Sequence, residues 1–118
     1  WKDFLEKEAL PSYYSTRAKA YYEEKKQYEL ARADYEEAAK LLPTDPAMAF
    51  RAGLMSLALG DGNRALTWYQ EGVKRTKTLS ADARAKAIKD ATDDVNRIVA
   101  ERGEARAFSS SVLDELKK

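Results

Sequence analysis

The sequence predicts an all-α protein built from a repeated helix-turn-helix unit. Ala, Glu, Lys, Arg and Leu dominate the chain, and all five favour helices. Only 5 Gly and 3 Pro occur among the 118 residues, and most of them lie between segments of helical length. The chain also contains an internal repeat with a constant offset of 34 positions. These features predict short connections between helices and no substantial strand.

The composition indicates a folded chain and excludes several classes of protein. Apolar residues make up 44% of the chain, which is too many for a disordered segment. No stretch approaches the roughly 18 uninterrupted apolar residues of a membrane span, so we expect no direct membrane insertion. Lys and Arg number 21 against 20 Asp and Glu, without a long basic run, so nucleic-acid binding is not expected either.

Residues suited to catalysis or metal binding are scarce. The chain has no Cys and no His, which removes thiolate nucleophiles and the commonest general base and metal ligand. Adjacent carboxylates such as Glu36-Glu37 and Asp93-Asp94 point about 100° apart on a helix, so we expect them to form solvated faces. Asp61-Gly62-Asn63 lacks the further oxygen ligands of a calcium loop. The sequence therefore predicts no enzyme, no metal ion and no cofactor.

Helix-breaking residues divide the chain into segments of helical length. Asp45 followed by Pro46 predicts a helix start, because Asp caps free N–H groups and Pro needs no hydrogen bond at the first helical position. Gly60 predicts the end of that helix, since glycine readily adopts the left-handed conformation. The predicted breaks are Leu10-Pro11-Ser12, Pro43 to Pro46, Gly60 to Gly62, Thr76 to Ser80 and Gly103.

Residues 12–45 match residues 46–79 when the two segments are aligned at the 34-residue offset. Two antiparallel helices need a small residue where they cross and a large ring one turn later to fill the adjacent space. We therefore expect Ala31 and Ala65 to be almost fully buried. The matched pairs are Ala18 and Ala52, Ala31 and Ala65, Tyr35 and Tyr69, and Ala38 and Gly72.

The repeated unit resembles the tetratricopeptide repeat (TPR). The motifs that carry the resemblance are Ala31-x3-Tyr35-x2-Ala38, which ends in Pro43, and Ala65-x3-Tyr69-x2-Gly72, with Tyr22 and Gly53 in the preceding helices. Ser15 and Ala49 stand where the family usually has Trp, and Lys77 replaces the closing proline. The resemblance implies a short right-handed α-solenoid of helix-turn-helix repeats that binds other proteins.

We expect one domain over residues 1–118, with atypical ends. Residues 1–11 are interpreted as the tail of a preceding helix, 12–45 as repeat one and 46–79 as repeat two. Residues 80–118 lack a third regular repeat and are expected to form capping helices, because the terminal unit of a solenoid has a polar outer face. The long C-terminal capping helix is predicted over 80–102, and an amphipathic helix over 104–117. Ser109 would cap a shorter version of the last helix.

The helix over residues 47–59 is apolar around nearly its whole circumference, so it must be covered on nearly all sides. The resemblance implies that the first helix of each repeat lines a concave groove, and Phe50, Leu54 and Leu57 are expected to project into it. Among the places matching the family's chaperone-binding clamp only Arg51 is cationic, so the resemblance does not extend to that clamp. The predicted partner-binding residues are Phe50, Leu54, Leu57, Tyr13, Arg51 and Arg84.

Two functions from different classes remain open at this point. The first is a protein-interaction scaffold or adaptor that binds an apolar or amphipathic segment of a partner protein in this groove. The alternative is a self-assembling module, in which the tail 104–117 or a second subunit of a homo-oligomer covers the groove. The start at Trp1 lacks Met and a leader, so we expect a processed form or part of something longer. The compartment stays open between cytoplasm and periplasm, with tethering through a segment upstream of Trp1 as one alternative.

Overall fold

A computed structural model describes residues 10–117, and the predicted tail of a preceding helix at residues 1–9 lies outside the described residues. The described part is all-α and contains no strand. Leu10 and Pro11 belong to its first helix instead of forming a break, and proline is tolerated in a first helical turn. The elements are α2 (Leu10–Glu23), α3 (Tyr28–Leu41), α4 (Pro46–Ala58), α5 (Gly62–Thr76), α6 (Ala81–Glu101), the short 3-10 helix η2 (Gly103–Ala105) and α7 (Arg106–Leu116).

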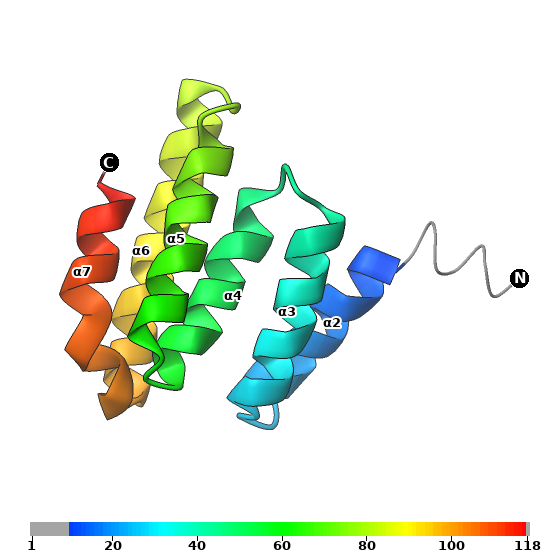
Figure 1. The fold of residues 1–118 in the computed structure, drawn as a ribbon, viewed down its shortest axis with the longest axis vertical. Helices are drawn as coiled ribbons and strands as arrows, with labels where there is room; N and C mark the ends of the chain where they lie inside the picture. The colour runs from blue at the N-terminus through cyan, green and yellow to red at the C-terminus, as the bar shows by residue number, and fades with distance from the viewer. Residues whose placement is uncertain (1–9, 118) are drawn as a thin grey trace, which may run out of the picture.

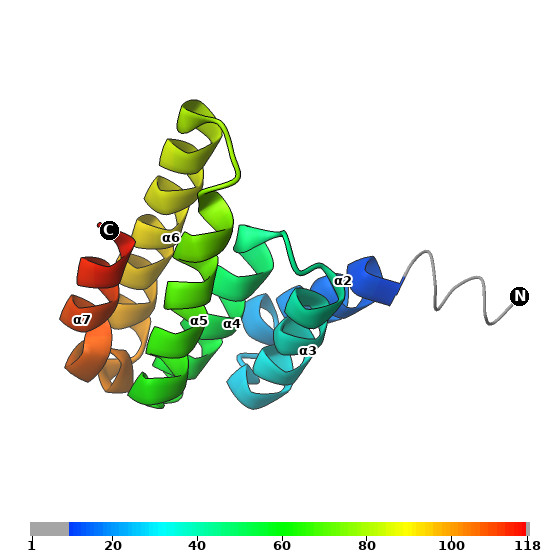
Figure 2. The same ribbon diagram turned by 45° about the horizontal axis from the view of Figure 1, so that its top comes forward.

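The helices follow one another across the molecule in chain order. Consecutive helices pack as the pairs α2 with α3, α4 with α5, and α6 with α7. Between pairs, α3 packs on α4, α4 on α6, and α5 on α7. Figures 1 and 2 show α2 and α3 at one side of the molecule and α6 and α7 at the other, so the two ends of the array face away from each other.

The ends of α4 confirm the predicted start and stop signals. The Asp45 side chain accepts a hydrogen bond from the backbone N–H of Ala47 at 2.9 Å, and Pro46 occupies the first turn. Gly60 has a φ of 79°, which is the left-handed conformation expected after a helix. Beyond it, the Asp61 N–H donates to the Ser56 carbonyl at 2.9 Å. The chain can therefore reverse into α5 over very few residues.

The four residue pairs matched by the 34-residue offset are all buried. Ala31 and Ala65 are both 0% exposed, which confirms the prediction for the two crossing points. Tyr35 and Tyr69 are 2% and 0% exposed. The Tyr69 hydroxyl has no hydrogen-bond partner in the described part of the chain, so its ring is held by packing alone.

Two glycines allow α4 and α5 to approach closely. A Cβ atom at Gly72 would lie 2.4 Å from a ring carbon of Phe50, and one at Gly53 would lie 2.8 Å from the Tyr69 ring. The centroids of the two rings are 5.8 Å apart. Each helix therefore has a glycine at the point where an aromatic ring of the other helix packs against it. Repeat one has Thr16 and Ala38 at the places of Phe50 and Gly72, so the large residue in repeat two is accompanied by the smaller partner.

Ion pairs with buried carboxylates connect α3 to α5 and α2 to α3. The Arg64 guanidinium and the Trp68 indole N–H both donate to the Glu36 carboxylate, with Arg64 Nε at 2.6 Å and Trp68 Nε1 at 2.8 Å. Because Glu36 is 6% exposed, the prediction that Glu36-Glu37 forms a solvated face is wrong for Glu36. Within the first pair, Arg17 holds the buried Asp34 with hydrogen bonds of 2.7 and 2.9 Å. The glutamate on α3 thus links the first helix pair to the second.

The C-terminal helices close the core and agree with the predicted capping helices. Ala91, Val95 and Ile98 of α6 are buried, as are Val112 and Leu116 of α7. Ser109 is not a helix cap, because α7 already begins at Arg106 and the Ser109 hydroxyl donates to the Arg106 carbonyl at 3.0 Å.

The close approach of α4 and α5 predicts a large effect of a single methyl group. Gly72→Ala should cost roughly 1 to 3 kcal/mol of unfolding free energy, because the buried Phe50 ring must move to admit the new Cβ. Gly103→Ala is the matched control, since a Cβ there meets nothing within 4 Å. Urea denaturation of both variants tests this. Equal stabilities would show that the Phe50 ring relaxes freely.

Candidate functional site

Helix α6 borders a cleft on one side and a groove on the other. The α4–α6 cleft has a volume of about 270 Å³, and the α6–α7 groove has a volume of about 600 Å³. Most of the α6 residues that line them are exposed or half-buried. These two hollows are the candidate binding sites of the described chain.

The α4–α6 cleft has small side chains on its α6 wall and larger ones on its α4 wall. Alanines on α6 leave space for a bound chain, and opposite them the Phe50 ring contributes an apolar edge and Arg51 a cation. The lining residues are Pro46, Ala47, Phe50, Arg51, Ala83, Lys86, Ala87, Asp90, Ala91 and Asp94. The cleft therefore combines an apolar base with charged groups of both signs.

Asp94 lines this cleft, and its carboxyl group has a raised pKa. Burial raises the pKa of Asp94, and the nearby cations Arg97 and Arg51 act in the opposite direction. The Arg97 guanidinium lies 3.0 Å from the Asp94 carboxylate. On the far side of this pair, Arg97 also stacks 5.6 Å above the ring of Tyr22 in α2. A polar cavity of about 130 Å³ between α2 and α6 extends the cleft, so the expected apolar groove is polar here.

The prediction that Phe50, Leu54 and Leu57 project into an open groove is wrong. Their exposures are 5%, 2% and 0%, because α3, α5 and α6 all pack against α4. The Arg102 guanidinium, just beyond α6, also donates to the Ala58 carbonyl at 3.3 Å. The cover comes from α3, α5 and α6 and not from the tail, since α7 packs mainly on α5 and α6. Phe50 still reaches the α4–α6 cleft by one edge, and Leu54 lines the polar cavity.

The remaining predicted site residues are spread over the molecule. Tyr13 is 53% exposed near the start of α2, where its hydroxyl accepts a hydrogen bond from Arg17 at 2.9 Å. The Arg17 guanidinium lies 5.0 Å from the Tyr13 ring centroid, so Tyr13 is part of a local cluster. Arg51 lines the α4–α6 cleft, whereas Arg84 lines the α6–α7 groove. The six residues therefore do not form one site.

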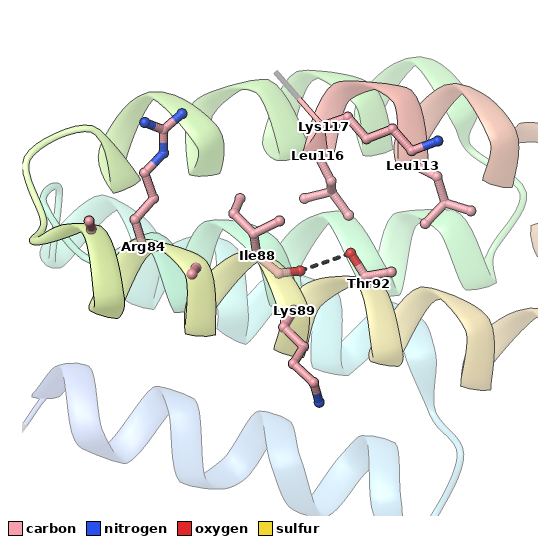
Figure 3. Close-up of a pocket in the computed structure, with 9 residues that line it drawn as sticks. Arg84, Ile88, Lys89, Thr92, Leu113, Leu116 and Lys117 are labelled. Atoms are coloured by element: carbon pink, nitrogen blue, oxygen red, sulfur yellow. Dashed lines mark hydrogen bonds between the residues drawn. The ribbon is translucent and has the colours of Figure 1, made fainter.

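The α6–α7 groove has an apolar floor and a cationic rim. Figure 3 shows Leu116 reaching from α7 toward Ile88 of α6 and Leu113 lying further along the groove on the side of Thr92, with Arg84 and Lys89 leaving α6 in different directions. Nearer the start of α6 the floor is formed by exposed alanines. The lining residues are Ala81, Arg84, Ala85, Ile88, Lys89, Thr92, Leu113, Leu116 and Lys117, and none of them is acidic.

Of the α6 residues that line these sites, sequence reasoning named only Arg84 as a site residue. Ala81, Ala83, Ala85 and Ala87 alternate along the start of α6, which places small side chains on both of its sides. That alternation was the available signal. Among residues 10–117 no group of three acidic, Cys or His side chains could hold a metal ion, and no helix is long and apolar enough to cross a membrane.

The burial of Leu57 predicts a core-like response to substitution. Leu57→Ala should cost about 2 to 5 kcal/mol, because it leaves a cavity beneath α6. Leu30→Ala is the matched control, since Leu30 is 48% exposed, and it should stay within about 0.5 kcal/mol of the parent. Chemical denaturation measures both. A neutral Leu57→Ala would mean that Leu57 is not part of the packed core.

The raised pKa of Asp94 predicts a pH dependence of stability. A carboxyl group with a higher pKa in the folded state binds its proton more tightly when folded, so its contribution is present at low pH and lost as the pH rises through the folded pKa. Asp94→Asn removes this loss. The unfolding free energy of the variant, minus that of the parent, should therefore increase from about pH 3 to about pH 7. Asp93→Asn is the control on the adjacent exposed position, and a decrease with pH for Asp94→Asn would contradict the burial of this carboxyl.

Comparison with known proteins adds no relative. No protein-family model matches the chain, and no curated protein or solved structure matches it either. The resemblance to the tetratricopeptide repeat therefore stays a prediction based on the repeated residues.

Proposed function

We propose that this chain is a TPR-like protein-binding domain, a short right-handed solenoid that catalyses nothing and holds a segment of a partner protein in the α4–α6 cleft. The burial of the four matched pairs supports the repeat interpretation, because a shared structural unit buries corresponding residues. The function then follows from the place where successive first helices of the units, α4 and α6, leave a cleft between them.

The observation that carries the proposal is the composition of this cleft. The Phe50 edge and the α6 alanines offer an apolar surface, while Arg51 and Lys86 face Asp90 and Asp94 around it. A site with an apolar base and few polar groups binds by burying an anchor side chain and orienting the rest through hydrogen bonds. At about 270 Å³ the cleft is smaller than a helix of about 10 Å diameter requires. An extended amphipathic segment is the ligand that fits.

A substitution that fills the cleft tests this function. Ala83 is exposed and lines the cleft, so Ala83→Trp should occupy the cleft without disturbing the fold. Ala85→Trp is the matched control, because Ala85 is exposed on the side of α6 that faces the α6–α7 groove. Peptides selected from a random library against the parent protein should lose binding to Ala83→Trp by about tenfold or more and keep their affinity for Ala85→Trp.

The opposite pattern would reject the cleft as the binding site. Peptides that bind Ala83→Trp as well as they bind the parent would show that the cleft is not used. Loss of binding with Ala85→Trp alone would move the site to the α6–α7 groove. Circular dichroism of both variants establishes that they remain folded.

A further inference from the structure

The α6–α7 groove and the outer face of α3 match each other in length and in the sizes of their side chains. On α6 the groove presents Ala81, Ala85, Ile88 and Thr92, which are spaced by four, three and four residues and share one face. On α3 an outer stripe consists of Leu30, Ala33, Glu37 and Leu41, spaced by three, four and four, and all four are exposed. Each stripe is about 17 Å long at 1.5 Å per residue.

The α3 stripe is unusually apolar for a helix face turned to solvent. Leu30 is 48% exposed and Leu41 is 41% exposed, and Leu42 follows directly at 37%. Large side chains on α3 would meet small alanines on α6, which is the arrangement that lets two helices approach closely. Burial of these residues against a second molecule removes apolar area from water.

The groove rim is cationic, and the α3 stripe carries one acidic residue, Glu37, next to Lys40. The groove has Arg84, Lys89 and Lys117 along its rim. The α3 stripe includes Glu37, and Glu29 lies one turn before Ala33. Lys89 and Glu37 have partners within the chain that are weak competitors. Lys89 pairs with Asp93 at 3.2 Å and Glu37 with Lys40 at 3.8 Å, and in both pairs each side chain is at least half exposed.

We propose that the α6–α7 groove binds the α3 stripe of a second copy of this chain, in a head-to-tail contact. The two surfaces lie at opposite ends of the helix array in Figure 1, so one molecule cannot make this contact with itself. A symmetric contact of groove with groove is disfavoured, because it brings two cationic rims together. A head-to-tail contact leaves one groove and one stripe unoccupied, so further copies can add to either end. This inference is independent of the proposed function, which uses the other side of α6.

Sedimentation equilibrium of the protein at low salt is the primary measurement. We expect association that increases with protein concentration, extends beyond the dimer and weakens as salt is added, since exposed charge pairs are screened. A protein that stays monomeric up to about 100 µM at low ionic strength would overturn the proposal, because charge attraction is strongest there.

Charge reversal on each surface identifies the contact. The groove variant Lys89→Glu/Lys117→Glu and the stripe variant Glu29→Lys/Glu37→Lys should each lose association by about tenfold or more, because both create like-charge contacts. An equimolar mixture of the two variants should associate again, since each then meets an oppositely charged surface. Failure of the mixture to associate would overturn the head-to-tail arrangement.

Two further variants separate this contact from the α4–α6 cleft. Lys86→Glu reverses a charge on α6 that lines the cleft and not the groove, so it should leave self-association unchanged. Ala85→Trp fills the groove and should abolish self-association, whereas Ala83→Trp should not. Loss of association with Ala83→Trp or Lys86→Glu would place the contact in the cleft. Circular dichroism of every variant distinguishes a lost contact from a lost fold.

Discussion

The close packing of α4 against α5 is the constraint on which the rest of the structure depends. Gly53 and Gly72 leave no side chain where Tyr69 and Phe50 place their rings, so the two helices interlock along their length. Interiors packed at this density transmit small changes in side-chain volume to their neighbours. Helix α3 packs on one side of this pair, and α6 and α7 pack on the other. Because α6 and α7 pack on this pair, the close approach at Gly53 and Gly72 helps to position both candidate sites.

Polar contacts determine how the N-terminal helices sit on this central pair. Glu36 is buried and accepts hydrogen bonds from Arg64 and Trp68, which both belong to α5. A buried carboxylate is tolerated only when its partners satisfy it, so the arrangement of α3 on α5 is more specific than apolar packing alone would make it. Arg75 adds a second restraint, because its guanidinium donates to the carbonyls of Leu42 and Asp45 in the connection between α3 and α4.

Local features of the fold could be read from the sequence, and features that depend on distant segments could not. Asp45, Pro46 and Gly60 act within a few residues of themselves, and the repeat offset identifies Ala31 and Ala65 from their matched neighbours. Whether Phe50 and Leu57 are covered depends on where α6 lies, and α6 begins more than twenty residues later in the chain. The burial of Glu36 likewise requires Arg64, which is supplied from another helix. The sequence shows the alternating alanines of α6, but it does not show that α4 and α7 pack on either side of them.

Helix α6 separates two hollows with a single wall. A rigid displacement of this helix toward α7 enlarges the cleft beside α4 and narrows the groove beside α7, and the reverse movement does the opposite. Two ligands whose sites share such a wall are thermodynamically linked, because each has a different affinity for the two positions of the helix. The linkage is reciprocal, so under the two proposals self-association and the binding of a partner segment would oppose each other. Under these proposals α6 is the element that couples the two.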